Sequence, residues 1–218
     1  MLINDAILVQ HAFTSRSISM VPPGIFHDMM RLTYQRHAAY TRAHNMDYWH
    51  LLSEELPELY PGGWGKVSFL RQAAQRHYEH IFWIDADAAI VDMDIDLREA
   101  LPEGMTGGAC IHDAHGIKKH LNIGVMYYRN TPELLPFLDE WLASYPGDKM
   151  WLEQGSFNVI YDSKKYKLCP VDDKWSATIN VNMVDKPAVY GWHGVNPIAA
   201  RLGMMKQSFY QDHIRFLV

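Results

Sequence analysis

The sequence has 218 residues, of which 48% are hydrophobic and 21% are charged, and its formal net charge is -5 at pH 7. These values exclude a disordered or fibrous chain, and the length predicts one globular domain over residues 1–218. Lysine and arginine are scattered apart from short pairs such as Lys118-Lys119. The chain therefore lacks the basic stripe that binding to nucleic acid requires, and no nucleic-acid partner is expected.

The ends and the cysteines of the chain bear on where the protein works. No basic region followed by a long apolar run is found at the N-terminus, and no stretch reaches about 18 uninterrupted apolar residues. We therefore expect no signal peptide, no membrane span and a soluble, cytoplasmic protein. Cys110 and Cys169 lie far apart in apolar stretches. They are expected to be buried free thiols in a reducing compartment.

The first part of the chain alternates strand patterns with helix patterns. Residues 6–9 are apolar and β-branched, and residues 26–45 place apolar side chains at helical steps. A strand over 46–52, a second helical stripe over 67–77 and a dense apolar run over 81–84 follow. This order predicts an α/β fold in which helices flank a central, mainly parallel sheet. Such sheets bind ligands beyond the carboxyl ends of their strands.

The second part of the chain continues this pattern with less regularity. Thr131, Pro132 and Glu133 have the residue types of an N-cap and a first helical turn, with Thr131 at the cap. Another helix is predicted over residues 151–160. The remaining segments predict strands, over residues 107–112, 123–128, 166–171 and 188–193.

Two aspartates follow the apolar run 81–84 directly. Alternate residues of a strand share a face, so Asp85 and Asp87 can converge on one cation if the backbone stays extended through Ala86. Carboxylates of this kind suit Mg²⁺ or Mn²⁺, which share their coordination with substrate phosphates. Two carboxylates at a core edge also repel each other unless a cation joins them. The pattern favours a metal site for a nucleotide diphosphate, and the alternative is a chance tripeptide that caps the next segment.

Six short motifs that span most of the chain carry a family resemblance. They are Tyr34–Tyr40, Trp64–Val67, Phe82–Ala88, Leu121–Val125, Trp151–Asn158 and Tyr190–Gly194. They resemble the GT-A glycosyltransferases, and within them the galactosyl- and mannosyltransferases of fungal mannan and plant cell walls. The sequence departs from that family at Asn45-Met46-Asp47. The resemblance implies a Rossmann-like nucleotide-diphospho-sugar transferase fold, a nucleotide-sugar donor, a glycan or glycoconjugate acceptor and Mn²⁺ or Mg²⁺.

The resemblance also implies roles for individual residues in holding the metal and the donor. The implied metal ligands are Asp85, Asp87 and His193. The implied donor-binding residues are Lys66, Ala86, Asn122, Gly124 and Lys206, with Arg201 as the second candidate for the role of Lys206. Three of these residues have a plainer alternative, because Gly124 can serve packing, a histidine such as His193 is usually structural and a lysine such as Lys206 usually lies on the surface.

The implied catalytic residues lie at the start of the predicted helix over 151–160. By resemblance, Gln154 stabilises the charge that develops at the anomeric carbon and Glu153 holds sugar hydroxyls. Glu153 replaces the usual aspartate, which leaves the catalytic assignment open, and its plainer alternative is a first-turn acid that suits the helix dipole. Retention of anomeric configuration is implied. Inversion stays open, with a general base among Asp113, Glu153, Asp172 and Asp173.

Three other functions compete with sugar transfer. A haloacid-dehalogenase-type phosphatase would use Asp85 as nucleophile, Asp87 as acid and Asp172-Asp173 for Mg²⁺, but its aspartate pair normally lies on the first strand. A nucleotidyltransferase would need a glycine-rich loop after the first strand, and residues 11–19 contain no glycine. A non-catalytic carbohydrate-binding protein would use the many aromatic residues.

A zinc site is a further alternative. Its ligands would be His112, His115 and His120, but no cysteine lies at a spacing that would complete the site. We interpret these histidines instead as part of an acceptor cleft.

Overall fold

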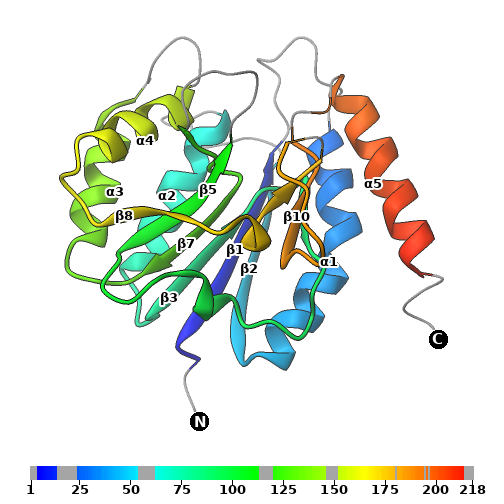
Figure 1. Ribbon diagram of the computed structural model, residues 1–218, viewed down its shortest axis with the longest axis horizontal. Helices are drawn as coiled ribbons and strands as arrows, with labels where there is room; N and C mark the ends of the chain where they lie inside the picture. Colours follow the sequence, from blue (N-terminus) through cyan, green and yellow to red (C-terminus); the bar gives the residue numbers. More distant parts are fainter. Residues whose placement is uncertain are drawn as a thin grey trace.

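The computed structural model describes residues 4–13, 24–53, 62–112, 120–145, 152–179, 181–193, 195 and 197–213. Within these residues the chain forms a seven-stranded sheet with helices packed against it and a three-stranded sheet beside it (Figure 1). The predicted α/β architecture is therefore confirmed.

The large sheet has the strand order β2-β1-β3-β7-β5-β6, and β8 pairs with β5. Strands β2, β1, β3, β5 and β8 point in one direction, whereas β7 and β6 point in the other, so the sheet is mainly parallel as predicted. The seven strands are β1 (Ala6–Phe13), β2 (Met46–Ser53), β3 (His80–Ile84), β5 (Gly107–His112), β6 (His120–Leu121), β7 (Val125–Arg129) and β8 (Leu168–Val171).

The small sheet joins the segment after β3 to the last part of the chain. Its strands are β4 (Ala88–Ile90), β10 (Val189–Gly191) and β9 (Ala177–Thr178), in that spatial order. Strand β10 runs antiparallel to β4 and parallel to β9. The pairing brings the residues after β10 beside those between β3 and β4.

The described residues also form five helices and three short 3₁₀ turns. In Figure 1, α1 and α5 lie together on one side of the molecule, while α2, α3 and α4 lie on the other. None of the helices in the described part of the chain combines the length and the apolar character that crossing a membrane requires. The helices are α1 (Ile25–Ala43), α2 (Gly65–Ala74), α3 (Leu134–Ala143), α4 (Leu152–Asp162) and α5 (Ile198–His213), and the turns are η1 (Gly62–Trp64), η2 (Leu97–Ala100) and η3 (Asp173–Trp175).

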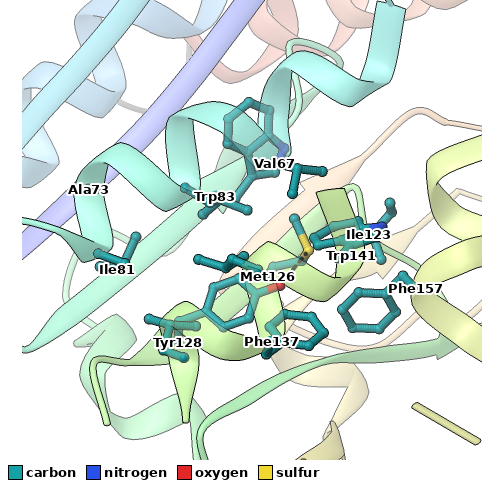
Figure 2. Close-up of a cluster of buried hydrophobic side chains, with 14 of the residues drawn as sticks. Val67, Ala73, Ile81, Trp83, Ile123, Met126, Tyr128, Phe137, Trp141 and Phe157 are labelled. Carbon is teal, nitrogen blue, oxygen red and sulfur yellow. Dashed lines mark hydrogen bonds between the residues drawn. The ribbon is translucent and has the colours of Figure 1, made fainter. Parts of the chain in front are cut away.

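Both faces of the central strands are buried, and alternate residues serve different clusters. On β1, Ile7 and Val9 pack in a cluster with residues of α2, α3 and α4, whereas Ala6 and Leu8 pack in a cluster with Tyr40 of α1. Figure 2 shows the first cluster, in which the aromatic rings of α3 and α4 lie close together, with Tyr128 of β7 beside Phe137. This alternation is what a strand covered on both faces requires, and it explains why the strand reads as a continuous apolar run.

Several predicted boundaries are corrected by the structure. Helix α3 begins at Leu134 and not after a threonine cap, because the Thr131 hydroxyl hydrogen-bonds Thr106 Oγ1 at 2.8 Å. Strand β7 begins at Val125, two residues later than predicted, because the preceding residues form a turn. Helix α5 was not predicted. Cys110 and Cys169 are buried free thiols, as expected.

Candidate active site

Most of the residues to which the sequence assigns a role in binding the metal or the donor gather at one edge of the large sheet. Asp85 follows β3, and because β7 runs antiparallel to β3, the turn before β7 lies at the same edge. The backbone N–H of Asp85 donates to the Gly124 carbonyl at 2.8 Å, which ties the two segments together. Helices α2 and α4 begin there, and β10 ends there. The edge is the carboxyl end of β3, where α/β sheets bind their ligands.

The backbone between the two aspartates forms a turn, so the extended backbone through Ala86 that would let both carboxylates converge on one cation is not found. The Ala88 N–H donates to the Asp85 carbonyl at 3.1 Å, and residues 86 and 87 are turn residues. Asp85 and Asp87 therefore bind different partners. Their ligand atoms and those of His193 do not all lie within 4.8 Å of one another, so the three side chains do not form one ligand set in this conformation.

Asp85 contacts a buried lysine. Lys66 Nζ lies 3.0 Å from Asp85 Oδ1, 3.2 Å from the Ile123 carbonyl and 3.9 Å from Glu153 Oε1. The Trp83 indole N–H also donates to Asp85 Oδ1, at 2.6 Å. Burial raises the pKa of Glu153, and the charge of Lys66 opposes this rise. The lysine thus joins the end of β3 to the start of α4, and the two acids compensate the cost of burying its charge.

Asp87 is buried and binds an arginine from the other end of the chain. Arg201 of α5 donates to Asp87 Oδ2 and also to the Val195 carbonyl, at 3.3 Å from Nη2. Burial alone would raise the pKa of Asp87, but His193 and Arg201 outweigh it and lower the pKa to about 2. Asp87 is therefore a carboxylate whose charge is already paired.

His193 lies between Asp87 and a threonine of the small sheet. Its Nε2 is 2.8 Å from Thr178 Oγ1, and its Nδ1 is 3.9 Å from Asp87 Oδ1. Nδ1 is buried and has no hydrogen-bond partner. A buried imidazole nitrogen without a partner that faces a carboxylate is the arrangement expected of two ligands of one divalent cation. Asp87 and His193 thus fit a metal ion, whereas Asp85 is turned toward Lys66.

The residues predicted to hold the donor and to act in catalysis flank these acids. Asn122 Oδ1 accepts the Gly124 N–H at 2.8 Å, and Gln154 Oε1 accepts the Ile123 N–H at 3.4 Å. A side chain at Gly124 would come within 3.1 Å of the His193 ring, so the glycine permits the close approach that its position in the sequence suggested. Ala86 is buried.

The two basic residues considered on the last part of the chain lie on different faces of α5. Lys206 is exposed, whereas Arg201 contacts Asp87. Five residues of an α-helix correspond to a rotation of about 140°, so the two side chains cannot face the same site. The structure therefore brings Arg201, and not Lys206, to the aspartate pair.

The residues of the competing functions are engaged elsewhere or lie outside the described residues. Asp172 caps η3 by accepting the Lys174 N–H at 2.9 Å, and Asp173 accepts a hydrogen bond from Asn182. For the zinc alternative, His112 pairs with His120 across β5 and β6, and His112 Nε2 is 3.0 Å from Thr178 Oγ1. Asp113 and His115 lie outside the described residues.

A buried polar network behind the aspartate turn was missed in the sequence. Gln10 of β1 donates to the Asp85 carbonyl at 3.3 Å and accepts from the Tyr48 hydroxyl at 2.6 Å. Its Oε1 also lies 3.2 Å from His37 Nδ1, and His37 Nε2 accepts the Ile90 N–H. These contacts fix the imidazole tautomer and hold both ends of the segment 85–90. The available signal was a glutamine directly after four apolar residues of β1.

One group of three possible ligands is present in the described residues, at Asp5, Glu79 and His80. Asp5 precedes β1, Glu79 precedes β3 and His80 begins β3, so the group lies at the opposite edge of the sheet from the aspartate turn. Asp5 and Glu79 are exposed, and Asp5 binds Arg98. We regard this group as a surface cluster.

Comparison with known proteins agrees with the resemblance in the sequence. Residues 9–106 match the galactosyl transferase GMA12/MNN10 family. Probable glycosyltransferase 6 of Oryza sativa subsp. indica is 29% identical over 122 residues, which are 53% of this chain and 25% of that protein. Galactomannan galactosyltransferase 1 of Cyamopsis tetragonoloba is 28% identical over 148 residues, which are 63% of this chain and 32% of that protein. The matched region thus spans only about a quarter to a third of these relatives.

Solved structures of glycosyltransferases share the fold over nearly the whole chain. A glycosyltransferase involved in the glycosylation of the major capsid of PBCV-1 has a TM-score of 0.68 at 13% identity, covering 93% of this chain and 98% of that one. The galactosyltransferase LgtC, solved with donor and acceptor sugar analogs, has a TM-score of 0.58 at 12% identity, covering 93% and 95%. The chain therefore has the fold of the GT-A glycosyltransferases, and it is related in sequence to the galactosyl transferase GMA12/MNN10 family.

Proposed function

We propose that the chain is a single glycosyltransferase domain, which transfers a sugar from a nucleotide-diphosphate sugar to a hydroxyl of a glycan or glycoconjugate. The observation that carries this proposal is the buried, unpartnered Nδ1 of His193 beside the Asp87 carboxylate at the ligand-binding edge of the sheet. The family match and the shared fold support the same reaction class.

In this proposal, Asp87 and His193 hold Mn²⁺ or Mg²⁺, and Asp85 joins them when its carboxylate leaves Lys66. The cation, once bound with the donor, would neutralise the charge that grows on the leaving diphosphate. Arg201 then lies beside the metal ligands, where its guanidinium can pair with phosphate oxygens. Asp85 and Asp87 are thus assigned to the metal ion, and Lys66 and Arg201 are assigned to the negative charge of the diphosphate.

The start of α4 would act on the donor sugar. The Gln154 side chain, now bound to the Ile123 N–H, lies beside the Asn122–Gly124 turn, so its amide can face the anomeric carbon and stabilise positive charge there. The Glu153 carboxylate would accept hydrogen bonds from sugar hydroxyls. We propose retention of anomeric configuration, because a neutral amide fits a stabilising role and not that of a general base.

Binding of the donor in the presence of the metal tests the proposal. Melting temperature is measured with Mn²⁺, with a panel of nucleotide sugars, and with both together, because a ligand that binds only the folded state raises it. We expect one donor to stabilise the protein in a manganese-dependent way. Asp87→Ala should remove the manganese-dependent part, whereas Asp94→Ala, at an exposed aspartate nearby, should not.

Two results would count against the proposal. Equal manganese-dependent stabilisation of the wild type and Asp87→Ala would remove Asp87 from the metal site. Hydrolysis of a generic phosphoester, without sugar transfer, would favour the phosphatase alternative. Once a donor is known, NMR of the product decides between retention and inversion.

A further inference from the structure

The carboxylate of Glu153 occupies the space beside Gly63 of η1 that a side chain at residue 63 would otherwise fill. If Gly63 had a Cβ atom, it would lie 2.1 Å from Glu153 Oε1, 2.4 Å from Cδ and 2.6 Å from Oε2. Real Cβ atoms do not approach other atoms so closely, so the position of this carboxylate depends on a glycine at residue 63.

The contact involves only the end of the glutamate side chain. Oε1, Cδ and Oε2 are its last atoms, and the same carboxylate lies 3.9 Å from Lys66 Nζ. The backbone of Glu153 is held separately, because its carbonyl accepts the Trp141 indole N–H at 2.9 Å. A methyl group at residue 63 would therefore displace the carboxylate and leave the start of α4 in place.

The length of the acidic side chain at residue 153 determines where its carboxylate lies. A glutamate is one methylene longer than the aspartate usual at this position of the family motif. Because residue 63 has no side chain, the longer glutamate can place its carboxylate beside Gly63 and near Lys66, which also contacts Asp85. An aspartate would not reach as far and would leave the space beside Gly63 empty.

We propose that Gly63 and Glu153 form a matched pair, in which the missing side chain at residue 63 sets the depth of the carboxylate that contacts the donor sugar. Gly63 is thus a positioning residue for sugar recognition. This inference rests on the proposed function, because it assigns the sugar contact of that site to Glu153. It adds that an acid of different length here requires a different residue on η1.

The experiment compares Gly63→Ala, Glu153→Asp and the double variant by calorimetric titration in the presence of Mn²⁺. Each protein is titrated with the nucleotide sugar found for the wild type and with the corresponding nucleoside diphosphate. The difference between the two affinities isolates the contribution of the sugar. Gly203→Ala is the matched control, because a Cβ at Gly203 of α5 would meet no atom within 4 Å.

Gly63→Ala is expected to lower the affinity for the nucleotide sugar about tenfold, which corresponds to the loss of one hydrogen bond to a charged group, and to leave the affinity for the nucleoside diphosphate unchanged. Glu153→Asp alone should also lower the affinity for the nucleotide sugar. In the double variant the shorter acid avoids the new methyl group, so the nucleotide sugar should bind more tightly than to Gly63→Ala. Gly203→Ala should bind both ligands as the wild type does.

Two outcomes would overturn the matched pair. One is sugar binding by Gly63→Ala equal to that of the wild type, and the other is a double variant whose loss equals the product of the two single losses. Failure of the wild type to bind any nucleotide sugar would instead refute the proposed function. In that case the pair is judged without ligand, from whether Glu153→Asp restores the melting temperature that Gly63→Ala lowers.

Discussion

Removing the guanidinium of Arg201 tests whether this residue takes the place of a cation at Asp87. Both side chains are nearly buried, at 13% and 6% exposed. Breaking a buried ion pair by removing one partner costs about 3–5 kcal/mol, because the other charge stays buried without compensation. We therefore expect Arg201→Gln to lower the free energy of unfolding by about 3 kcal/mol, since glutamine keeps one hydrogen bond. Arg31→Gln is the control, because its ion pair with Asp28 is exposed and contributes less than about 0.5 kcal/mol.

The same variant should respond to metal more strongly than the wild type. Without Arg201, a divalent cation can neutralise Asp87 without first displacing a guanidinium. Urea unfolding with and without Mn²⁺ measures both effects, and we expect Mn²⁺ to recover most of the stability that Arg201→Gln loses. If Arg201→Gln is as stable as the wild type, or if Mn²⁺ stabilises both proteins equally, the guanidinium does not substitute for a cation at this carboxylate.

Three further predictions follow from the packing and the burial of charge. In Gly191→Ala the new Cβ would lie 2.2 Å from the His193 ring, so this variant should lose manganese-dependent thermal stabilisation while remaining folded. Burial lowers the pKa of His37 from 6.5 to about 3, so the unfolded chain binds a proton that the folded protein excludes; His37→Gln should flatten the loss of stability below pH 6.5 by about 1.4 kcal/mol per pH unit, measured by urea unfolding from pH 7 to pH 5. Phe137→Ala removes a fully buried ring from the cluster in Figure 2 and should cost about 3–5 kcal/mol, read from the same unfolding curves at pH 7.

The position of the two aspartates at the edge of the sheet could be predicted from the sequence, because it depends on local patterns. The run before Asp85 is apolar on both faces, and a strand that ends at a charged pair must end at the edge of the sheet. The helix predicted over residues 151–160 corresponds to α4, which begins at Leu152 in the described residues. These features require only the burial preference of a strand and the periodicity of a helix.

The conformation of the aspartate pair could not be predicted in this way. The turn at Ala86 is held by β4, which pairs with β10 about a hundred residues later, and the Trp192 N–H donates to the Asp87 carbonyl. Contacts of such separation leave no periodic signal in the sequence. The partner of Asp87 was missed for a different reason, because α5 was not predicted although Ile198, Leu202, Met205 and Phe209 lie at helical steps. Met205 is buried in a cluster with residues of α1, and the other three pack against that cluster.

The two aspartates each have one basic partner, and the partners come from opposite ends of the chain. Lys66 neutralises Asp85 and Arg201 neutralises Asp87, and Glu153 is a third acid that lies 3.9 Å from Lys66. A cation that binds alone would have to displace a basic side chain and leave its charge buried without a partner. A diphosphate that binds together with the cation brings negative charge to which the released guanidinium or ammonium can pair. We therefore expect Mn²⁺ and a nucleoside diphosphate to bind cooperatively, each raising the affinity of the other by the same factor in calorimetric titrations. Independent binding of the two would mean that Lys66 and Arg201 keep their carboxylates in the bound state, and the proposed metal site would then need ligands other than these aspartates.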